Sequence, residues 1–337
     1  MKALHRGRSG MTNWEGKSVL VTGATGLVGS WLVRKLLEEG AYISALVLDM
    51  DPSSELIRSG DFDKLSVING DLADFNAVSR AVHQNASEIV FHLGAQTIVG
   101  TALVDPIRTF QSNIQGTWNV LEAVRNSHGR VKSVMVASSD KAYGNARYLP
   151  YKEDHPLHGD GPYDVSKSCT DLIAQSYATT YKLPVTIARC GNIYGGGDLN
   201  WSRIVPGTIR SLLSGQAPVI RSDGTFVRDY VHVDDVVDAY IHLAQTAQLG
   251  EINGEAFNFS RDEPLNVMEL YRAICIGVTG AEVEPQILSS ARSEIQDQHL
   301  DSSKARTELG WTPKVSLTDG LARTIQWYKT YLERFKP

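Results

Sequence analysis

The sequence predicts an α/β fold in which a doubly wound parallel sheet is joined to a smaller α+β unit. Short β-branched runs alternate with amphipathic helical stretches through the first half of the chain, as in parallel sheets that are covered on both faces. A glycine-rich loop separates the first run from the first helical stretch. The 337 residues are 42% hydrophobic, which is enough for the buried core of one large or two interlocked domains.

Six short runs are the expected strands, at residues 17–22, 41–48, 66–68, 88–92, 133–137 and 184–189. The first helical pattern follows the glycine loop and stops at Gly40. Further amphipathic helices are expected at residues 74–84, 106–127 and 164–182. This alternation is the basis for a sheet whose strands run parallel.

The second half of the chain is less regular, because glycines and prolines interrupt it at positions 195–197, 206, 218 and 224. A helix at 233–244, a strand at 256–259 and a helical tail at 300–335, around the sequence 309–313, are predicted there. We expect a sheet domain of residues 14–192 and 231–260 and a smaller domain of residues 193–230 and 261–337. Residues 1–13 are expected to be a disordered leader.

The composition excludes several kinds of partner and location. With 33 basic and 38 acidic residues the net charge is −5. The chain therefore lacks the excess of basic residues that favours binding to nucleic acid or to an anionic membrane surface. No apolar run is long enough to span a membrane, and the N-terminus lacks the apolar stretch of a secretory signal. Cys169, Cys190 and Cys275 are far apart and odd in number, which favours a reducing cytoplasm without disulfides or a zinc site. His155 and His158 lack the partners that a metal site needs.

The glycine loop between the first strand and the first helix predicts a dinucleotide site. Glycines at 23, 26 and 29 let the backbone approach a diphosphate, and the helix N-terminus adds free N–H groups and partial positive charge. The alternative is a plain tight turn. We therefore predict a Rossmann domain whose loop contacts come from Gly23, Thr25, Gly26, Leu27, Val28 and Gly29.

Two acidic residues are candidates for the adenosine end of the dinucleotide. Asp49 ends the second strand and suits the ribose hydroxyls, and the lack of an arginine beside it favours NAD over NADP. The alternative is a solvated acid in a loop. Asp71, followed by Leu72, is placed to meet the adenine, although a simple turn residue is about equally plausible.

Polar and glycine-rich segments follow four of the expected strands. Because ligands gather at the carboxyl ends of parallel strands, these exits predict one shared site. Leu93, Gly94 and Ala95 are expected beside the cofactor, and Gln96 and Asn192 beside the substrate.

Tyr163 and Lys167 lie one helical turn apart on the same face of a predicted helix. A phenol is a poor base at neutral pH, since its usual pKa is about 10, and a nearby ammonium favours its ionised form. Lys167 is also placed to hold the nicotinamide ribose, and Ser139 to share the proton of a substrate alcohol. This set predicts alcohol oxidation at a nicotinamide; a surface tyrosine and lysine are the alternative.

Asp140 and Lys141, directly after Ser139, suggest a second task, the removal of water beside a carbonyl. A protonated Asp140 would be the acid and a neutral Lys141 the base. As neighbours they would stabilise each other's charged forms, which opposes both roles. In an extended segment, however, adjacent side chains point opposite ways and would address opposite ends of the substrate. An exposed ion pair on a loop is the alternative.

Arginines in the second half of the chain are suited to a diphosphate-bearing substrate, because guanidinium binds phosphate oxygens with paired donors. Arg228 is the first candidate and Arg292 the second, and Arg203 is also predicted to bind the substrate. For Arg292 the alternative is a solvated position on the surface.

These motifs together resemble the extended short-chain dehydrogenase/reductase family, from about residue 14 to residue 327. Within it the chain is most similar to the nucleotide-sugar 4,6-dehydratases, and especially to those that act on CDP-glucose. The similarity lies in residues 14–17, 29–32, 91–96, 113–117, 139–141, 191–198 and 309–313. The dehydratases of dTDP-glucose carry Asp-Glu where this chain has Asp140-Lys141, and many dehydratases have threonine at the position of Ser139.

The resemblance implies a tightly held NAD, oxidation of the sugar at carbon 4, loss of water across carbons 5 and 6, and return of the hydride to carbon 6. It gives oxidation to Ser139, Tyr163 and Lys167, and elimination to Asp140 and Lys141. It also gives Asn113 a position that shapes the site and binds the substrate, and it places Asn192 near the substrate phosphates. Members of this family usually form homodimers through a four-helix bundle, here built from the stretches 106–127 and 164–182.

The sequence thus predicts a lyase, an NAD-dependent nucleotide-sugar 4,6-dehydratase with CDP-glucose as its substrate. A GDP-, UDP- or dTDP-hexose dehydratase and a nucleotide-sugar 4-epimerase remain open alternatives. A noncatalytic NAD-sensing module is disfavoured, because such proteins often lose the tyrosine–lysine pair that this chain retains.

Overall fold

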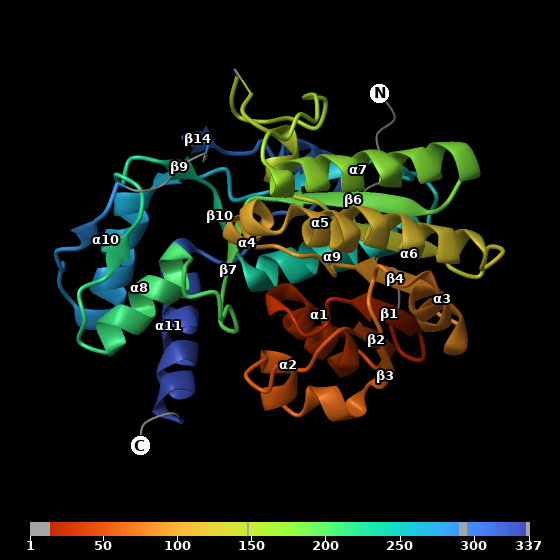
Figure 1. Ribbon diagram of the computed structural model, residues 1–337, viewed down its shortest axis with the longest axis horizontal. Helices are drawn as coiled ribbons and strands as arrows, with labels where there is room; N and C mark the ends of the chain where they lie inside the picture. The colour runs from red at the N-terminus through yellow and green to blue at the C-terminus, as the bar shows by residue number, and fades with distance from the viewer. Residues whose placement is uncertain (1–13, 147, 290–294, 335–337) are drawn as a thin grey trace.

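The computed structural model describes residues 14–146, 148–289 and 295–334 (Figure 1). The expected leader, residues 1–13, and the candidate Arg292 therefore lie outside the described residues.

A seven-stranded parallel sheet forms the centre of the chain, with the strand order β11-β6-β5-β4-β1-β2-β3. Its strands are β1 (Ser18–Thr22), β2 (Tyr42–Val47), β3 (Ser66–Asn69), β4 (Ile89–His92), β5 (Ser133–Ala137), β6 (Val185–Cys190) and β11 (Ala256–Phe259). All six strands predicted in the first half lie in this sheet, and the predicted strand at 256–259 is its seventh. The predicted doubly wound, Rossmann-type fold is confirmed.

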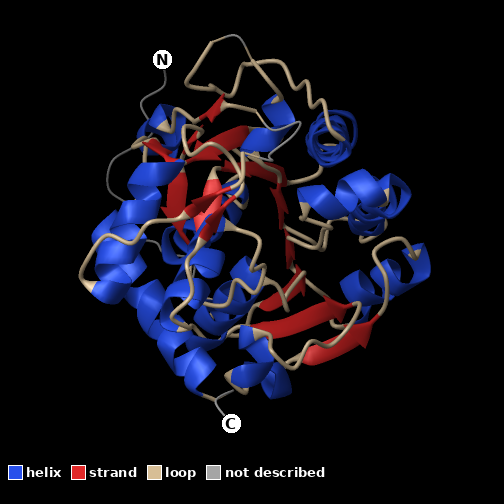
Figure 2. Cartoon of the chain, turned by 60° about the vertical axis from the view of Figure 1, so that its left-hand side comes forward, coloured by secondary structure: helices blue, strands red, loops and turns tan. Residues whose placement is uncertain are grey.

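Helices cover both faces of the sheet (Figures 1 and 2). One face packs against α1 (Leu27–Glu38) and α9 (Val233–Ala247), and the other against α3 (Phe75–Gln84), α6 (Gly116–Arg125) and α7 (Pro162–Tyr181). Successive residues of β1 serve opposite faces: Val19 and Val21 pack in the first core and Leu20 in the second. This alternation explains why apolar residues occupy both faces of β1.

The predicted helix 106–127 is a chain of shorter helical segments. It contains α5 (Pro106–Phe110), a π-helical turn η2 (Gln111–Gln115) and α6, and α4 (Val99–Val104) precedes them. Short helical segments also lie at α2 (Glu55–Arg58), η1 (Asp61–Lys64) and η3 (Asp140–Tyr143). The segments α2, α4, η1 and η3 lie outside the predicted helices, because a helix of one or two turns has little periodicity to detect.

The smaller unit is built around α8 (Ile204–Leu213), α10 (Val267–Thr279) and α11 (Leu317–Glu333). Buried Ile209, Ile274 and Ile325, one from each helix, share its apolar core. Its strands are short, namely β7 (Asn192–Tyr194), β8 (Val219–Ile220), β9 (Val227–Arg228), β10 (Tyr230–His232), β12 (Leu265–Asn266), β13 (Gln286–Ile287) and β14 (Asp297–Gln298). The predicted domain boundaries assign all seven sheet strands to one domain and α8, α10 and α11 to the other, and this division stays a prediction.

Two expectations for this half were incomplete. Pro206 does not break the chain as predicted, because it lies in the first turn of α8, where its missing N–H group is not needed. The helical tail expected at 300–335 is interrupted: a π-helical turn η4 (Ala305–Leu309) ends at Gly310, whose φ is +69°, and α11 begins only at Leu317. Every helix in the described part of the chain is too short or too polar to cross a membrane.

Candidate active site

A cleft of about 1210 Å³ lies at the carboxyl ends of β1, β4, β5 and β6 and is closed on its other side by residues of the smaller unit. It brings together nearly all of the predicted site residues. Those that line it are Gly23, Thr25, Gly26, Leu27, Val28, Gly29, Asp49, Asp71, Leu72, Leu93, Gly94, Ala95, Gln96, Ser139, Asp140, Lys141, Tyr163, Lys167, Asn192, Arg203 and Arg228. Asn113 does not line it.

The glycine loop has the close backbone packing that a dinucleotide site requires. Gly23 has a φ of +74°, and a Cβ atom there would lie 2.7 Å from the backbone nitrogen of Gly94. A Cβ atom on Gly29 would lie 2.1 Å from the carbonyl oxygen of Gly23. Gly26 gives α1 no side-chain cap, so the first N–H groups of this helix suit a diphosphate. The residues present therefore fit the predicted NAD.

The two acidic candidates differ in their surroundings. Asp49 is exposed at the wall of the cleft. Asp71 accepts a hydrogen bond from the backbone of Ala73 (2.9 Å) and pairs with Arg108 (2.8 Å). Asp71 is thus a turn residue that also lines the cleft, and its contact with the adenine stays a prediction.

Tyr163 and Lys167 lie on α7, which begins with Pro162 at its first position. Burial raises the pKa of Tyr163 to about 12, against the charge of Arg203 and a hydrogen bond with Ser139, which both lower it. The Lys167 ammonium donates to the carbonyl of Ala137 at the end of β5 (2.9 Å), and burial lowers its pKa to about 8. Arg203, rather than the expected Lys167, is therefore the largest cationic influence on the phenol.

Asp140 and Lys141 lie in a 3₁₀ turn and not in the extended segment that was expected. The reason is Ser139, whose hydroxyl accepts a hydrogen bond from the Lys141 N–H group (3.2 Å) and caps η3. The same hydroxyl donates to the Asp140 carboxylate (2.9 Å). Both residues line the cleft. The extended conformation was wrong, because the segment is a 3₁₀ turn, and the prediction that the two side chains address opposite ends of the substrate stays a prediction.

Burial decides the charge of Asp140. Its side chain is 4% exposed, and desolvation raises the pKa of the carboxyl. Lys141, Ser139 and Arg228 all act in the opposite direction but do not outweigh it. The Lys141 charge does stabilise the carboxylate, as expected, but the pKa of Asp140 is still higher than that of an ordinary aspartate.

Asn113 lies behind the cleft wall. Its amide oxygen accepts from the Gln96 N–H group (2.7 Å), and its amide nitrogen donates to the Gln96 carbonyl (2.9 Å) and to Ser166 (2.8 Å). These bonds use its polar atoms, so Asn113 holds the Gln96 backbone in place and does not form part of the cleft surface as expected.

The two described arginine candidates reach the cleft while making contacts of their own. Arg203 pairs with Asp198 (3.0 Å). Arg228 is buried and donates to the carbonyls of Val227, Gln296 and Ile295. Cleft residues that the sequence analysis did not single out include Trp201, Arg210, Phe226, Tyr240 and Leu288. Their segments carry no motif, so only the folded chain identifies them.

The described residues contain no group of three or more histidine, cysteine or acidic side chains able to hold a metal ion. The fold and the cleft thus define a dinucleotide-binding α/β protein whose reactive groups are a phenol, an amine, a hydroxyl and a buried carboxyl.

The chain belongs to the NAD dependent epimerase/dehydratase family, whose model matches residues 19–259. Membership gives the class of enzyme and confirms NAD as the cofactor predicted from the glycine loop.

Relatives of both reaction types are similar to this chain. CDP-glucose 4,6-dehydratase of Salmonella typhimurium is 33% identical over 337 residues, which cover 95% of this chain and 92% of that one. UDP-glucose 4-epimerase of Mycolicibacterium smegmatis is 31% identical, with 92% and 98% covered. The crystal structure of dTDP-glucose 4,6-dehydratase from Streptomyces venezuelae with NAD bound has a TM-score of 0.82 at 28% identity, and covers 93% of this chain and 97% of that one.

Because the pKa of Lys167 is about 8, we expect the affinity for NAD to fall as the pH rises. If the ammonium holds the nicotinamide ribose, the loss of its charge weakens binding by up to about tenfold between about pH 7 and pH 9. Calorimetric titration of the NAD-free chain across this range measures the effect. In Lys167→Met the affinity is expected to be lower and nearly independent of pH. An unchanged wild-type affinity over the same range would contradict this role of Lys167.

Proposed function

We propose that the chain is an NAD-dependent nucleotide-sugar 4,6-dehydratase and that its substrate is CDP-glucose. The observation that carries the proposal is the presence of Asp140 and Lys141 in the same cleft as Tyr163 and Lys167. Oxidation alone needs only the second pair and Ser139. A buried acid and a neighbouring amine serve a further proton transfer, such as the loss of water.

In the oxidation step, Tyr163 takes the proton of the carbon-4 hydroxyl with help from Ser139. The glycine loop would hold NAD, which would supply an acceptor for the hydride of carbon 4 and a donor of that hydride to carbon 6. The raised pKa of Tyr163 makes the phenol neutral at rest, so it first gives up its own proton to solvent; Ser139 and Arg203 favour the resulting phenolate, which then accepts the hydroxyl proton.

In the elimination step, Asp140 protonates the departing hydroxyl of carbon 6 and Lys141 removes the proton of carbon 5. The raised pKa of Asp140 suits an acid, because a larger fraction of the carboxyl carries a proton near neutral pH. The carbon-4 ketone formed first makes the carbon-5 proton acidic enough to remove, so the two pairs act in sequence.

The choice of CDP-glucose rests on the Asp-Lys pair and on the similarity to the Salmonella enzyme. A nucleotide-sugar 4-epimerase is the second candidate, because the Mycolicibacterium epimerase is nearly as similar. An epimerase would use Tyr163 and Lys167 but would give Asp140 and Lys141 no task.

Incubation with CDP-, dTDP-, UDP- and GDP-hexoses, followed by product analysis, tests the function. We expect a 4-keto-6-deoxy sugar from CDP-glucose with no net change in NADH. Lys141→Met is expected to slow product formation by about 10²–10⁴-fold while bound NADH still appears, because only the base of the elimination is lost. Tyr163→Phe is the matched control and should abolish both signals. Inversion at carbon 4 without dehydration would favour the epimerase instead.

We also propose that the protein is a cytoplasmic homodimer in which α5–α6 and α7 of two copies form a four-helix bundle. Figure 1 shows these helices side by side. Leu103, Val104, Ile107, Trp118 and Leu172, all on α4–α7, are large apolar side chains that remain exposed. An apolar surface of this kind on neighbouring helices is typical of a protein interface.

Leu172→Arg is expected to convert the dimer to a monomer, because a buried, unpaired guanidinium opposes association. Sedimentation velocity of the purified protein measures the mass. Leu249→Arg changes another exposed leucine, which follows α9, and it should leave the dimer intact. A wild-type protein that sediments as a monomer would refute the proposed assembly.

A further inference from the structure

We propose that Tyr143 is a positioning residue for the elimination step. It belongs to a buried network with Arg189 and Asp171 that fixes the η3 turn against α7. The inference rests on the proposed function, because η3 carries Asp140 and Lys141, the elimination pair, and α7 carries Tyr163 and Lys167, the oxidation pair. The network would keep the two pairs in register on one substrate.

On the helix side, the network begins one turn after Lys167. Tyr163, Lys167 and Asp171 are spaced four residues apart and so share one face of α7. The Asp171 carboxylate is fully buried and accepts two hydrogen bonds from Arg189, at 2.7 and 2.9 Å. This paired geometry fixes both the position and the orientation of the guanidinium. The helix that holds the oxidation pair is thereby joined to β6.

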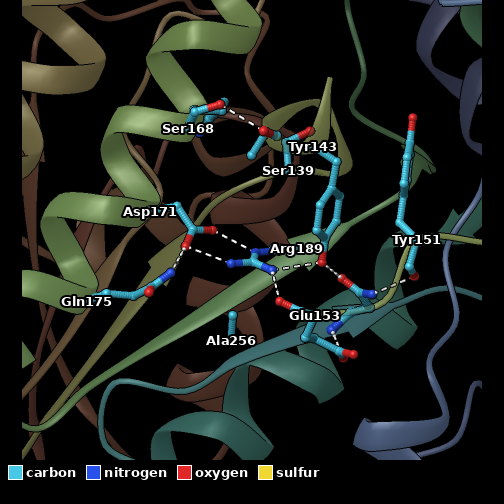
Figure 3. Close-up of polar contacts among 12 residues, drawn as sticks. Ser139, Tyr143, Tyr151, Glu153, Ser168, Asp171, Gln175, Arg189 and Ala256 are labelled. Carbon is cyan, nitrogen blue, oxygen red and sulfur yellow. Dashed lines mark hydrogen bonds and ion pairs between the residues drawn. The ribbon is translucent and has the colours of Figure 1, made fainter. Parts of the chain in front are cut away.

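On the turn side, the network ends at the phenol of Tyr143, the last residue of η3. Its oxygen accepts from Arg189 (2.8 Å), as Figure 3 shows, and donates to Asn258 (2.7 Å). Its ring stacks on Tyr151, with ring centroids 4.9 Å apart. Burial raises the pKa of Tyr143, so the phenol is neutral and acts through hydrogen bonds alone. The phenol does not line the cleft, so it has no direct contact with the chemistry.

A second link joins α7 directly to the backbone of the turn. The Ser168 hydroxyl, one residue after Lys167, donates to the carbonyl of Ala142 (2.7 Å) and accepts from the Gly159 N–H group (3.0 Å). The turn is closed on its far side as well, because a Cβ atom on Gly144 would lie 1.7 Å from the carbonyl oxygen of His158.

The turn needs such external support. A 3₁₀ segment as short as η3 has poor internal hydrogen-bond geometry and little stability of its own. The positions of Asp140 and Lys141 therefore depend on what holds Ala142 and Tyr143. Because small misplacements of catalytic groups cost large factors in rate, loosening this support should reduce elimination specifically.

Tyr143→Phe tests the inference, since it removes the phenol oxygen and keeps the ring. With CDP-glucose, we expect reduction of bound NAD to stay within about twofold of wild type and product formation to fall about tenfold. Bound NADH should therefore accumulate. Its absorbance measures the partition, that is, the rate of NAD reduction relative to the rate of product formation. A merely structural role would lower both steps equally.

Tyr271→Phe is the matched control. Tyr271 is also a buried tyrosine whose phenol donates a hydrogen bond, to the carbonyl of Val283 (2.8 Å), but it lies on α10. It should lower the melting temperature to a similar extent without changing the partition.

Hydrogen exchange gives a readout that needs no substrate. The amides of Ala142 and Gly144 bond to the carbonyls of Ser139 and Lys141 within the turn, both at 3.1 Å. They should exchange faster in Tyr143→Phe than in wild type or Tyr271→Phe.

Two negative outcomes are distinguishable. A wild-type protein that forms no 4-keto-6-deoxy sugar overturns the proposed function. A wild-type protein that dehydrates its substrate, with an unchanged partition or unchanged turn exchange in Tyr143→Phe, overturns the network alone.

Discussion

Desolvation at the floor of the cleft is the constraint on which the rest of the site depends. Asp140 and Lys167 are both buried where parallel strands end, and burial moves each toward its neutral form. The pKa of the carboxyl rises and that of the amine falls to about 8. In water neither group would exchange protons readily near neutral pH. In the cleft the carboxyl keeps its proton to a higher pH and so is available as a proton donor, while the amine can lose its charge within a moderate pH range.

The sheet order explains how groups so distant in sequence share this environment. β1, β4, β5 and β6 are neighbours, so Gly23, Gly94, Ser139 and Asn192 leave the sheet along one edge. α7 then crosses beside β6 and brings Tyr163 and Lys167 to the same edge. The cofactor loop, the oxidation pair and the elimination pair therefore meet without any long loop having to be ordered by itself. The smaller unit closes the cleft and contributes its arginines.

What could be predicted from the sequence follows from how local each signal is. The strands, the glycine loop and the Tyr163–Lys167 spacing depend on neighbours within a few residues, and the structure reproduces each pattern. The capping box of Asn266 and Glu269 was a readable local signal for α10 that went unused. The 3₁₀ turn after Ser139 was not predicted, because a single side-chain cap decides between it and an extended strand.

Other features depend on partners far away in sequence. Asn113 points to the Gln96 backbone and not to the cleft, and Arg228 binds carbonyls near residue 295. The cationic influence on Tyr163 comes mainly from Arg203, forty residues further along the chain. No spacing rule encodes such contacts, since they arise only when the whole chain folds. The same is true of Trp201 and Phe226, which line the cleft from segments without periodicity.

The central claim is that one cleft oxidises carbon 4, removes water, and returns the same hydride to carbon 6. Its most direct test is the fate of deuterium placed at carbon 4 of CDP-glucose, followed by mass spectrometry and nuclear magnetic resonance of the product. The account predicts a 4-keto-6-deoxy sugar that carries the deuterium at carbon 6. Deuterium found again at carbon 4 of an inverted hexose, or lost to water, would contradict it.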